Sequence, residues 1–234
     1  MLTLHTQCIK LYRKIVPARV RDTIGKVRSR KPAWTVAQAP SGRWYFSDYT
    51  KPRWDTEYRT DRWRYMSGLE ELSRYSVVVG YVRFFKPDAK VLDLGSGEGI
   101  LQERFGYESY SRYLGVDVSQ AAIDAARTRE DSRTSFVCAD VATFVPDGKF
   151  DVVVFNEVLY YLREPLAVMK HYEKFLSPGG IFIVSMFNNE ELTHNWTTLE
   201  CAYDFFDETR ASNSKSGCSW SCRVWQSPCP ERAG

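Results

Sequence analysis

The segment from Val91 to Gly99 constrains the fold of this chain more than any other part, because an apolar run leads directly into a turn with three glycines. A glycine turn between a buried strand and a helix is typical of the mononucleotide-binding half of a doubly wound sheet, where ligands lie beyond the carboxyl ends of the strands. A dinucleotide-binding fingerprint would place its third glycine at position 100, where this chain has Ile100. The spacing therefore argues against a nicotinamide cofactor.

An acidic residue, Asp93, comes two positions before the first glycine of the turn, Gly95. A carboxylate next to a bound pyrophosphate would repel it, whereas the same carboxylate suits a ligand that carries an ammonium group. The turn therefore predicts a nucleotide-like ligand with a positive charge.

Further apolar runs follow and alternate with helical patterns, which is typical of a parallel sheet covered by helices. We expect strands over residues 91–94, 113–117, 135–138, 151–155, 181–185, 203–206 and 219–225. We expect helices over 67–85, from Gly99 onward, over 120–129 with Ser119 as N-cap, from Glu164 with Pro165 in its first turn, and over 190–199.

The first 32 residues form a strongly basic segment in which Asp22 is the one acid among nine Lys and Arg. Apolar residues recur in this segment at spacings of three to five, which predicts an amphipathic helix interrupted at Pro17. Such a helix suits contact with a membrane surface or an anionic partner, and the alternative is a solvated helix that docks its apolar stripe on the rest of the chain. We expect no nucleic-acid partner, because the remaining residues show no matching basic stripe.

The sequence shows no apolar run of the length that a membrane-spanning helix needs, and no signal peptide, so we expect a cytoplasmic protein. Its six cysteines include no CxxC pair. Cys218, Cys222 and Cys229 lie close together, but their irregular spacing without a nearby His argues against zinc. We therefore predict no metal site.

Five motifs in order resemble those of class I S-adenosylmethionine-dependent methyltransferases of the small-molecule type. The segment 91–99 resembles the first motif, 115–119 the second-strand motif, 138–141 the third-strand motif, 150–159 the fourth-strand motif, and 176–180 the turn into the fifth strand. The segment after the fourth strand, with Glu157 and the pair Tyr160 and Tyr161, also resembles nodulation-type N-methyltransferases.

The resemblance implies S-adenosylmethionine as cofactor and gives its binding residues separate roles. Gly95 and Gly97 would let the backbone approach the ligand, while Asp93 would face the methionine ammonium. Asp117 would accept from both ribose hydroxyls, and Asp140 from the adenine amine. The predicted cofactor-binding residues are Arg74, Asp93, Gly95, Gly97, Asp117, Val118, Asp140, Val141 and Asn156. For Arg74 the expected partner is the methionine carboxylate, and the alternative is a surface ion pair.

The resemblance also implies the fold class, an α/β fold with a Rossmann-like, seven-stranded, mostly parallel sheet, helices on both faces, an antiparallel last strand and a helical N-terminal extension. The expected organisation is the basic amphipathic extension 1–32, a linker and aromatic cap over 33–66, and an S-adenosylmethionine-binding methyltransferase domain over 67–234.

Three residues are candidates for the chemistry of methyl transfer, which needs an aligned nucleophile and, for some acceptors, removal of its proton. Tyr161 stands where related enzymes often carry a His. His194 lies just beyond the fifth strand, and its alternative is an exposed helix residue. Glu157 is a second candidate base, and its alternative is an acid that stabilises a helix start.

We expect an enzyme that methylates an oxygen or nitrogen of a small molecule, such as a sugar, a glycan or a lipid-linked intermediate. The alternative is a catalytically inactive S-adenosylmethionine-binding domain that acts as a partner or scaffold. The sequence makes no statement about the oligomeric state.

Overall fold

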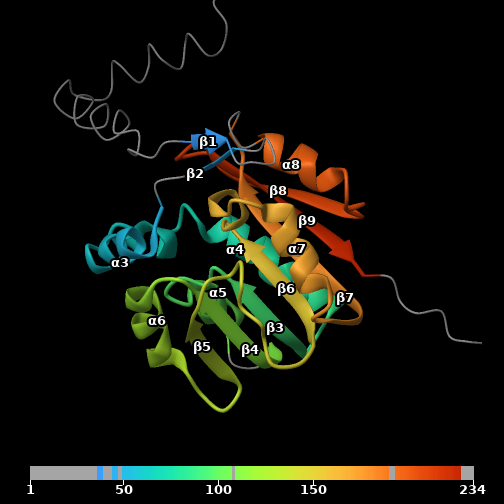
Figure 1. The fold of residues 1–234 in the computed structure, drawn as a ribbon, viewed down its shortest axis with the longest axis horizontal. Helices are drawn as coiled ribbons and strands as arrows, with labels where there is room; N and C mark the ends of the chain where they lie inside the picture. Colours follow the sequence, from blue (N-terminus) through green and yellow to red (C-terminus); the bar gives the residue numbers. More distant parts are fainter. Residues whose placement is uncertain (1–35, 39–43, 47–48, 107–108, 190–192, 228–234) are drawn as a thin grey trace, which may run out of the picture. The chain divides into compact units, whose positions relative to one another are not determined.

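The computed structural model describes residues 36–38, 44–46, 49–106, 109–189 and 193–227. A seven-stranded sheet lies at its centre, in the strand order β5-β4-β3-β6-β7-β9-β8 (Figure 1). These strands are β3 (Ala89–Leu94), β4 (Tyr110–Asp117), β5 (Thr134–Cys138), β6 (Phe150–Asn156), β7 (Leu176–Phe187), β8 (Asp207–Asn213) and β9 (Cys218–Gln226). Strands β3 to β7 pair in parallel, whereas β9 runs antiparallel to both β7 and β8. The predicted mostly parallel sheet with an antiparallel last strand is therefore confirmed.

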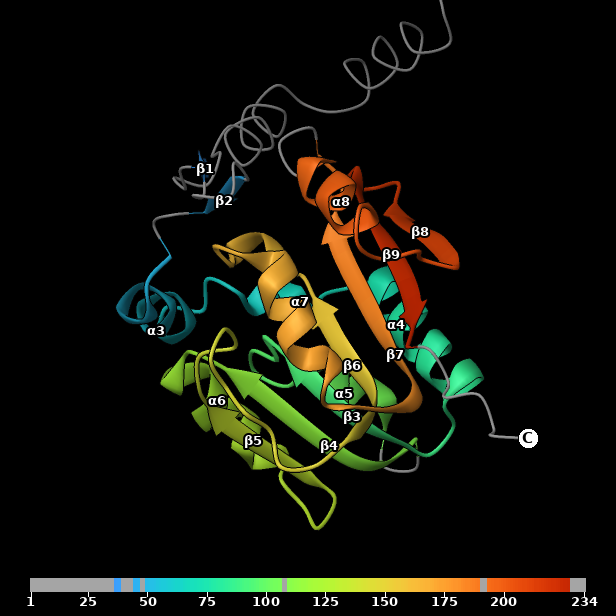
Figure 2. The same cartoon turned by 45° about the vertical axis from the view of Figure 1, so that its right-hand side comes forward.

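Helices cover both faces of the sheet, as Figures 1 and 2 show for α4 and α7. One face carries α4 (Leu72–Phe85), α5 (Ile100–Phe105) and α6 (Gln120–Ala126). The other carries α7 (Pro165–Glu173), with α8 (Thr193–Glu200) packed beside it. Short 3-10 helices are η1 (Arg64–Ser67), η2 (Arg127–Arg129) and η3 (Leu159–Tyr161).

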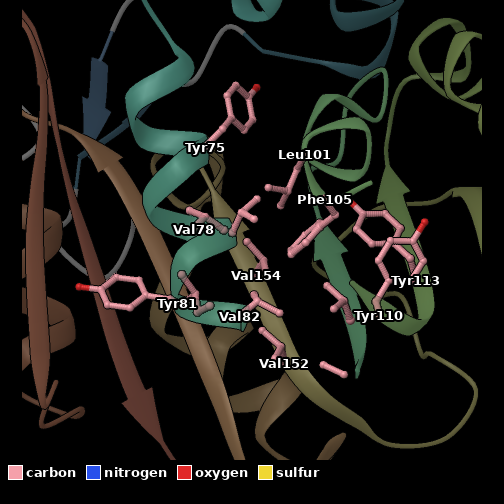
Figure 3. Close-up of a cluster of buried hydrophobic side chains, with 14 of the residues drawn as sticks. Tyr75, Val78, Tyr81, Val82, Leu101, Phe105, Tyr110, Tyr113, Val152 and Val154 are labelled. Atoms are coloured by element: carbon pink, nitrogen blue, oxygen red, sulfur yellow. The ribbon is translucent and has the colours of Figure 1, made fainter. Parts of the chain in front are cut away.

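The main core lies between the sheet and the helices α4, α5 and α6 (Figure 3). Val152 and Val154 of β6 point into this core, while Phe155 points to the opposite face and packs on Tyr172 of α7. Successive side chains of a strand alternate between faces, so a strand with helices on both sides must be apolar throughout. This explains why β6 reads as a continuous apolar run.

Local signals at two helix starts are confirmed. The Ser119 side chain accepts a hydrogen bond from the backbone N–H of Ala122 and so caps α6. Pro165 stands in the first turn of α7, where its missing N–H costs nothing. The expected helix over 120–129 continues beyond α6 as η2.

The strand expected at 203–206 is wrong, because the structure has β8 at Asp207–Asn213 instead. Tyr203 is a buried packing residue whose ring lies 5.1 Å from that of Trp225. Strand β8 is the exposed edge of the sheet and carries polar side chains, such as Glu208, which pairs with Arg223 of β9. An apolar pattern cannot find such an edge strand.

Two expectations before the sheet also change. The helix expected over 67–85 begins only at Leu72, because η1 and the extended residue Gly68 precede it, and Leu69 is exposed. The segment 33–66, expected as linker and cap, contains a two-stranded hairpin of β1 (Val36–Gln38) and β2 (Trp44–Phe46), and the helix α3 (Lys51–Arg59). The amphipathic helix expected in residues 1–32 lies outside the described residues.

Strand β3 has β4 on one side and β6 on the other, so the strand order reverses at its carboxyl end. This switch point is where open α/β sheets bind ligands. Within the described part of the chain, no helix has the length and apolar character needed to cross a membrane.

We predict opposite effects of two Gly to Ala substitutions. A Cβ on Gly115 of β4 would lie 2.4 Å from the buried ring of Phe136, so Gly115→Ala should lower the free energy of unfolding by about 1–3 kcal/mol. Gly80 lies in α4 with open space around it, so Gly80→Ala should raise that free energy by up to about 1 kcal/mol. Urea denaturation measures both, and equal effects would contradict the predicted crowding at Gly115.

Candidate functional site

The glycine turn joins β3 to α5 and requires backbone conformations that glycine adopts without strain. Gly95, Gly97 and Gly99 have φ values of 78°, 54° and 79°. A Cβ on Gly95 would lie 2.6 Å from Val158, and one on Gly97 would lie 2.8 Å from the hydroxyl of Tyr58. Side chains are therefore excluded where the turn lies closest to its surroundings.

Asp117 lies at the carboxyl end of β4 and contacts the turn directly. One of its oxygens accepts from the backbone N–H of Gly97 at 2.9 Å, and the other accepts from that of Ser119 at 2.8 Å. Burial raises the pKa of Asp117, although both backbone hydrogen bonds act to lower it. Each oxygen keeps a second lone pair for a ligand hydroxyl.

Asp93 lies at the end of β3 and is almost fully buried. It accepts a hydrogen bond from the hydroxyl of Tyr113. Burial raises the pKa of Asp93 to about 7, and the nearby carboxylate of Asp117 adds to the rise, while the Tyr113 hydrogen bond and the charge of Arg74 oppose it. A positively charged ligand beside Asp93 would favour its ionised form.

The residues expected at the adenine end of the cofactor follow β4 and β5. Asp140 is exposed and accepts from the backbone N–H of Ala142 at 2.8 Å, while Val141 is buried. The carbonyl of Val118 accepts from Lys51 Nζ at 2.6 Å. Strands β3, β4 and β5 are parallel, so their carboxyl ends lie next to one another. Asp93, Asp117 and Asp140 therefore lie at the same end of the sheet.

An aromatic lid, formed by Tyr49, Trp54, Tyr58, Trp63 and Tyr161, brings α3 and the turn after it together with the segment after β6. The ring of Trp54 lies 4.5 Å from that of Tyr49, 4.9 Å from that of Tyr161 and 5.5 Å from that of Trp63. Trp63 is buried within this cluster, so part of the lid is packed like a core.

Helix α3 also contacts the start of α6 through polar groups. Asp55 accepts from Ser119 Oγ at 2.7 Å and from the backbone N–H of Ala121 at 3.2 Å. Lys51, Asp55 and Tyr58 are spaced as i, i+4 and i+7, which places them on one face of the helix. The sequence analysis did not identify Lys51 or Asp55. The pattern that could have predicted them is their spacing on one helical face, together with Pro52 in the first turn of α3.

A pocket lies between the lid and the glycine turn. Among the residues that line it are Tyr58 and Trp63 of the lid, Tyr75 of α4, Asp93, Gly97 and Asn156. The pocket thus joins an acidic group at the end of β3 to aromatic walls and to the end of β6. Such a combination of apolar walls and few polar groups is typical of small-molecule sites.

Glu157 follows β6 in a left-handed conformation, with φ 60°, which is strained for a residue other than glycine. Its buried carboxylate accepts from the Tyr160 hydroxyl at 2.8 Å, Ser185 Oγ at 3.0 Å and the Phe187 N–H at 3.1 Å. Burial raises the pKa of Glu157 to about 7, against the opposing charge of Arg74 and the hydrogen bonds from Tyr160 and Ser185.

Comparison with known proteins identifies the chain. A family model described as a methyltransferase domain matches residues 58–217, which is more than half of the chain. The chain belongs to the class I S-adenosylmethionine-dependent methyltransferase family. The ubiquinone biosynthesis O-methyltransferase of Coxiella burnetii (strain Dugway 5J108-111) is 27% identical over 119 residues, which cover 49% of this chain and 50% of that protein. The chain therefore spans about half the length of the curated relatives it matches.

Two solved structures share the fold. The N-methyltransferase NodS from Bradyrhizobium japonicum WM9, in complex with S-adenosyl-l-homocysteine, has a TM-score of 0.65 at 22% identity, over 76% of this chain and 98% of that one. The 1,6-didemethyltoxoflavin-N1-methyltransferase of Burkholderia thailandensis has a TM-score of 0.65 at 17% identity, over 85% and 97%. At these identities the likeness concerns the fold.

The structure brings most of the predicted cofactor residues to the carboxyl ends of the parallel strands, with Arg74 in an unexpected setting. Arg74 is fully buried rather than at the surface, and its Nε donates to Glu71 at 2.8 Å. Its Nη1 donates to Asn156 Oδ1 at 2.6 Å. Arg74 therefore touches the pocket through Asn156.

The candidates for catalysis have separate positions in the structure. Glu157 lies in a buried polar cluster and Tyr161 in the aromatic lid. His194 falls within α8, and its side chain lies outside the described residues. Cys218 and Cys222 lie in β9, Cys229 lies outside the described part, and the described residues show no cluster of metal-ligating side chains.

We predict that Asp93→Asn changes how the stability of the protein depends on pH. The folded pKa of about 7 lies above the ordinary 3.8, so the folded state holds a proton that the unfolded chain releases. The Asp93 contribution to stability therefore falls as the pH rises from about 4 to about 7. Asp93→Asn should make the decline in unfolding free energy over this range shallower.

Urea denaturation at several pH values between about 4 and about 7 measures this slope. Asp147→Asn, at an exposed position, is the matched control and should leave the slope unchanged. An unchanged slope in Asp93→Asn would contradict the raised pKa.

Proposed function

We propose that this protein transfers the methyl group of S-adenosylmethionine to an oxygen or nitrogen of a small molecule. The observation that carries the proposal is one pocket lined by Asp93, the glycine turn and the lid residues Tyr58 and Trp63, with Asp117 bound to that turn through the backbone N–H of Gly97. From β3 to β4, the order of Asp93 and Asp117 matches the order of the methionine and ribose parts of the cofactor.

The residues fit the cofactor on steric and chemical grounds. Side chains at Gly95 and Gly97 would collide with Val158 and Tyr58, so the turn leaves backbone for close approach. Asp93 supplies a carboxylate for the methionine ammonium, and Asp117 supplies one for the ribose hydroxyls. Asp140 and the N–H of Val141 would face the adenine. When bound, the cofactor supplies an electrophilic methyl group on a sulfonium.

The contribution of the chain to methyl transfer is mainly positioning and exclusion of water. The displacement needs the nucleophile aligned with the methyl group, and the lid rings of Trp63 and Tyr58 wall the pocket from which it would approach. Glu157, whose pKa burial raises to about 7, stays a proposal as base for acceptors that need one. Tyr161 and His194 stay proposals for contact with the acceptor.

We further propose a sugar, a glycan or a lipid-linked intermediate as acceptor, in a cytoplasmic protein that contacts the inner face of the membrane through residues 1–32. The support is the basic amphipathic pattern of that segment. The described residues offer no second argument for a membrane.

We predict that the protein binds S-adenosylhomocysteine and that Asp117→Asn weakens this binding by about 10- to 100-fold, because hydrogen bonds to a charged group contribute about 1.5–3 kcal/mol. Isothermal titration calorimetry measures the affinity. Asp124→Asn, an exposed change on the neighbouring helix α6, is the matched control and should bind like the unchanged protein. Binding of NAD without S-adenosylhomocysteine would overturn the cofactor assignment.

Release of S-adenosylhomocysteine, measured across a panel of sugars, glycans and aromatic small molecules, tests the activity itself. Release with at least one acceptor is the expected result. Tight cofactor binding with no release across the panel would favour the alternative function, an inactive domain that serves as a partner or scaffold.

We predict that the full chain sediments with vesicles containing anionic lipid and that this binding is lost at high salt, because it rests on surface charge. Changing Arg13, Lys14 and Arg21 to Gln should weaken it. The control changes Arg127, Lys170 and Lys215 to Gln, at exposed positions of the described part. Equal sedimentation of both variants and the unchanged chain would contradict a role for residues 1–32.

A further inference from the structure

Strand β8 is an open edge of the sheet (Figures 1 and 2). It pairs with β9 on one side, and within the described part of the chain no strand pairs with its other side. Such an edge presents unpaired backbone N–H and C=O groups, which can pair with a further strand. The opposite edge, β5, is partly closed, because a side-chain oxygen of Glu130 accepts from the backbone N–H of Phe136.

Exposed aromatic side chains lie beside the start of β8 and form an aromatic patch of Phe84, Phe85 and Phe206. Phe84 is 80% exposed and Phe206 is 48% exposed. The ring of Phe85 joins them, since it lies 4.8 Å from the ring of Phe84 and 5.3 Å from that of Phe206. Single apolar residues are common on protein surfaces, whereas contiguous exposed apolar patches mark contact with a partner.

Tyr81 fixes helix α4 beside β8. Its hydroxyl donates to Asp207 Oδ2 and lies 2.8 Å from Thr209 Oγ1. Figure 3 shows the ring of Tyr81 directed away from the other labelled core residues. One flank of α4, which ends in the aromatic patch, therefore lies next to the open edge.

The charged side chains of β8 form a self-complementary pattern. Glu208 and Arg210 stand on either side of Thr209 and share one face of the strand. The Nε of Arg210 donates to Glu208 Oε1 at 3.1 Å, and the Arg210 side chain is 75% exposed. A guanidinium has five N–H donors, so Arg210 keeps donors for a second carboxylate.

A second copy of β8 could pair with this edge in an antiparallel direction, about a two-fold axis normal to the sheet. Side chains opposite each other then lie on the same face, so the axis passes through a residue of β8. An axis at Glu208 or at Arg210 would place like charges opposite each other. An axis at Thr209 instead places Glu208 of each copy opposite Arg210 of the other, which is the favourable arrangement.

The same axis brings the aromatic patch to an apolar part of the second copy. Because the axis is normal to the sheet, the two α4 helices lie on the same face and run in opposite directions. Tyr81 lies beside the axis, so Phe85 of one copy lies level with Val77 of the other. Val77 is an apolar residue that is only partly buried. The open strand, its charges and the flank of α4 therefore agree on one axis.

We propose that the open edge of β8 and the adjacent flank of α4 form an interface with a second copy of this chain, in which two β8 strands pair antiparallel about a two-fold axis at Thr209. The two sheets then form one continuous sheet, and pairing closes both open edges, so association stops at the dimer. Strands β7 and β9 separate the pocket of each copy from the interface, which therefore leaves both pockets uncovered.

Sedimentation equilibrium of the full chain measures the association. The unchanged chain should form a dimer that dissociates on dilution. Arg210→Glu leaves only acids at the paired positions, and Glu208→Arg leaves only bases, so each variant alone should raise the dissociation constant at least about tenfold. An equimolar mixture of the two variants restores opposite charges between the strands and should recover the dimer.

Lys170→Glu, at an exposed position of α7, is the matched control for a reversed charge and should leave the dimer unchanged. Recovery in the mixture is the decisive result, because damage to the fold of either variant could not produce it. Two variants that stay monomeric when mixed would overturn the proposed pairing.

Phe84→Gln tests the aromatic patch and should raise the dissociation constant about tenfold, because it removes an exposed aromatic ring from the interface. Val145→Gln is the matched control, since Val145 is 64% exposed in the segment between β5 and β6, and it should leave the dimer unchanged. Thermal unfolding of each variant shows whether the fold is kept.

A monomer at every concentration would overturn the proposal and leave the flank of α4 to another occupant, such as the apolar stripe predicted in residues 1–32. A dimer that both single charge variants leave intact would place the contact elsewhere and would equally contradict it. These measurements need no cofactor, so their outcome is independent of the proposed function.

Discussion

The carboxylate of Asp117 is the interaction on which the rest of the site depends. It accepts from the backbone N–H groups of Gly97 and Ser119, and the carbonyl of the same residue accepts from the N–H of Ala139. One residue thus joins the glycine turn after β3, the start of α6 and the end of β5. Burying a carboxylate costs free energy unless donors compensate it, and here the donors are backbone groups whose positions the fold sets. A change of the Asp117 side chain would therefore disturb both the glycine turn and the start of α6, and not one contact alone.

The lid also depends on the contact between Asp117 and Ser119, because Ser119 uses both its backbone N–H and its hydroxyl. Its backbone N–H donates to Asp117, while its hydroxyl caps α6 and donates to Asp55 of α3. Helix α3 also reaches the end of β4 through Lys51, which donates to the carbonyl of Val118, and reaches the glycine turn through Tyr58. The lid therefore contacts the site along the length expected for the cofactor. These contacts hold α3 over the pocket.

The sequence predicts those parts of the structure that depend on interactions between residues close together in the chain. Apolar runs and the glycine turn reveal β3 to β7 and the switch point, and Ser119 reveals the start of α6, because burial on both faces and helix capping each leave a signal in adjacent residues. The sequence pattern does not predict the edge strand β8, because its exposed polar side chains are also typical of a loop. The sequence pattern also does not predict the burial of Arg74, because its contact with Asn156 joins residues that are 82 positions apart. Whether a charged residue is buried depends on such distant partners, and neither periodicity nor spacing encodes them.

The placement of buried charge gives the pocket an acidic character, since Asp93 and Glu98 are among its lining residues. Arg74 is paired with Glu71, and burial holds the pKa of both Asp93 and Glu157 near 7, so the site contains acids that are only partly ionised at neutral pH. A cationic ligand beside Asp93 would favour its ionised form, and binding would then release a proton. The sulfonium of S-adenosylmethionine adds a positive charge that S-adenosylhomocysteine lacks. An acidic pocket therefore favours the substrate form of the cofactor over its product, and a free arginine facing the pocket would weaken that preference. The contacts of Arg74 with Glu71 and Asn156 compensate its charge within the protein and so keep this electrostatic preference.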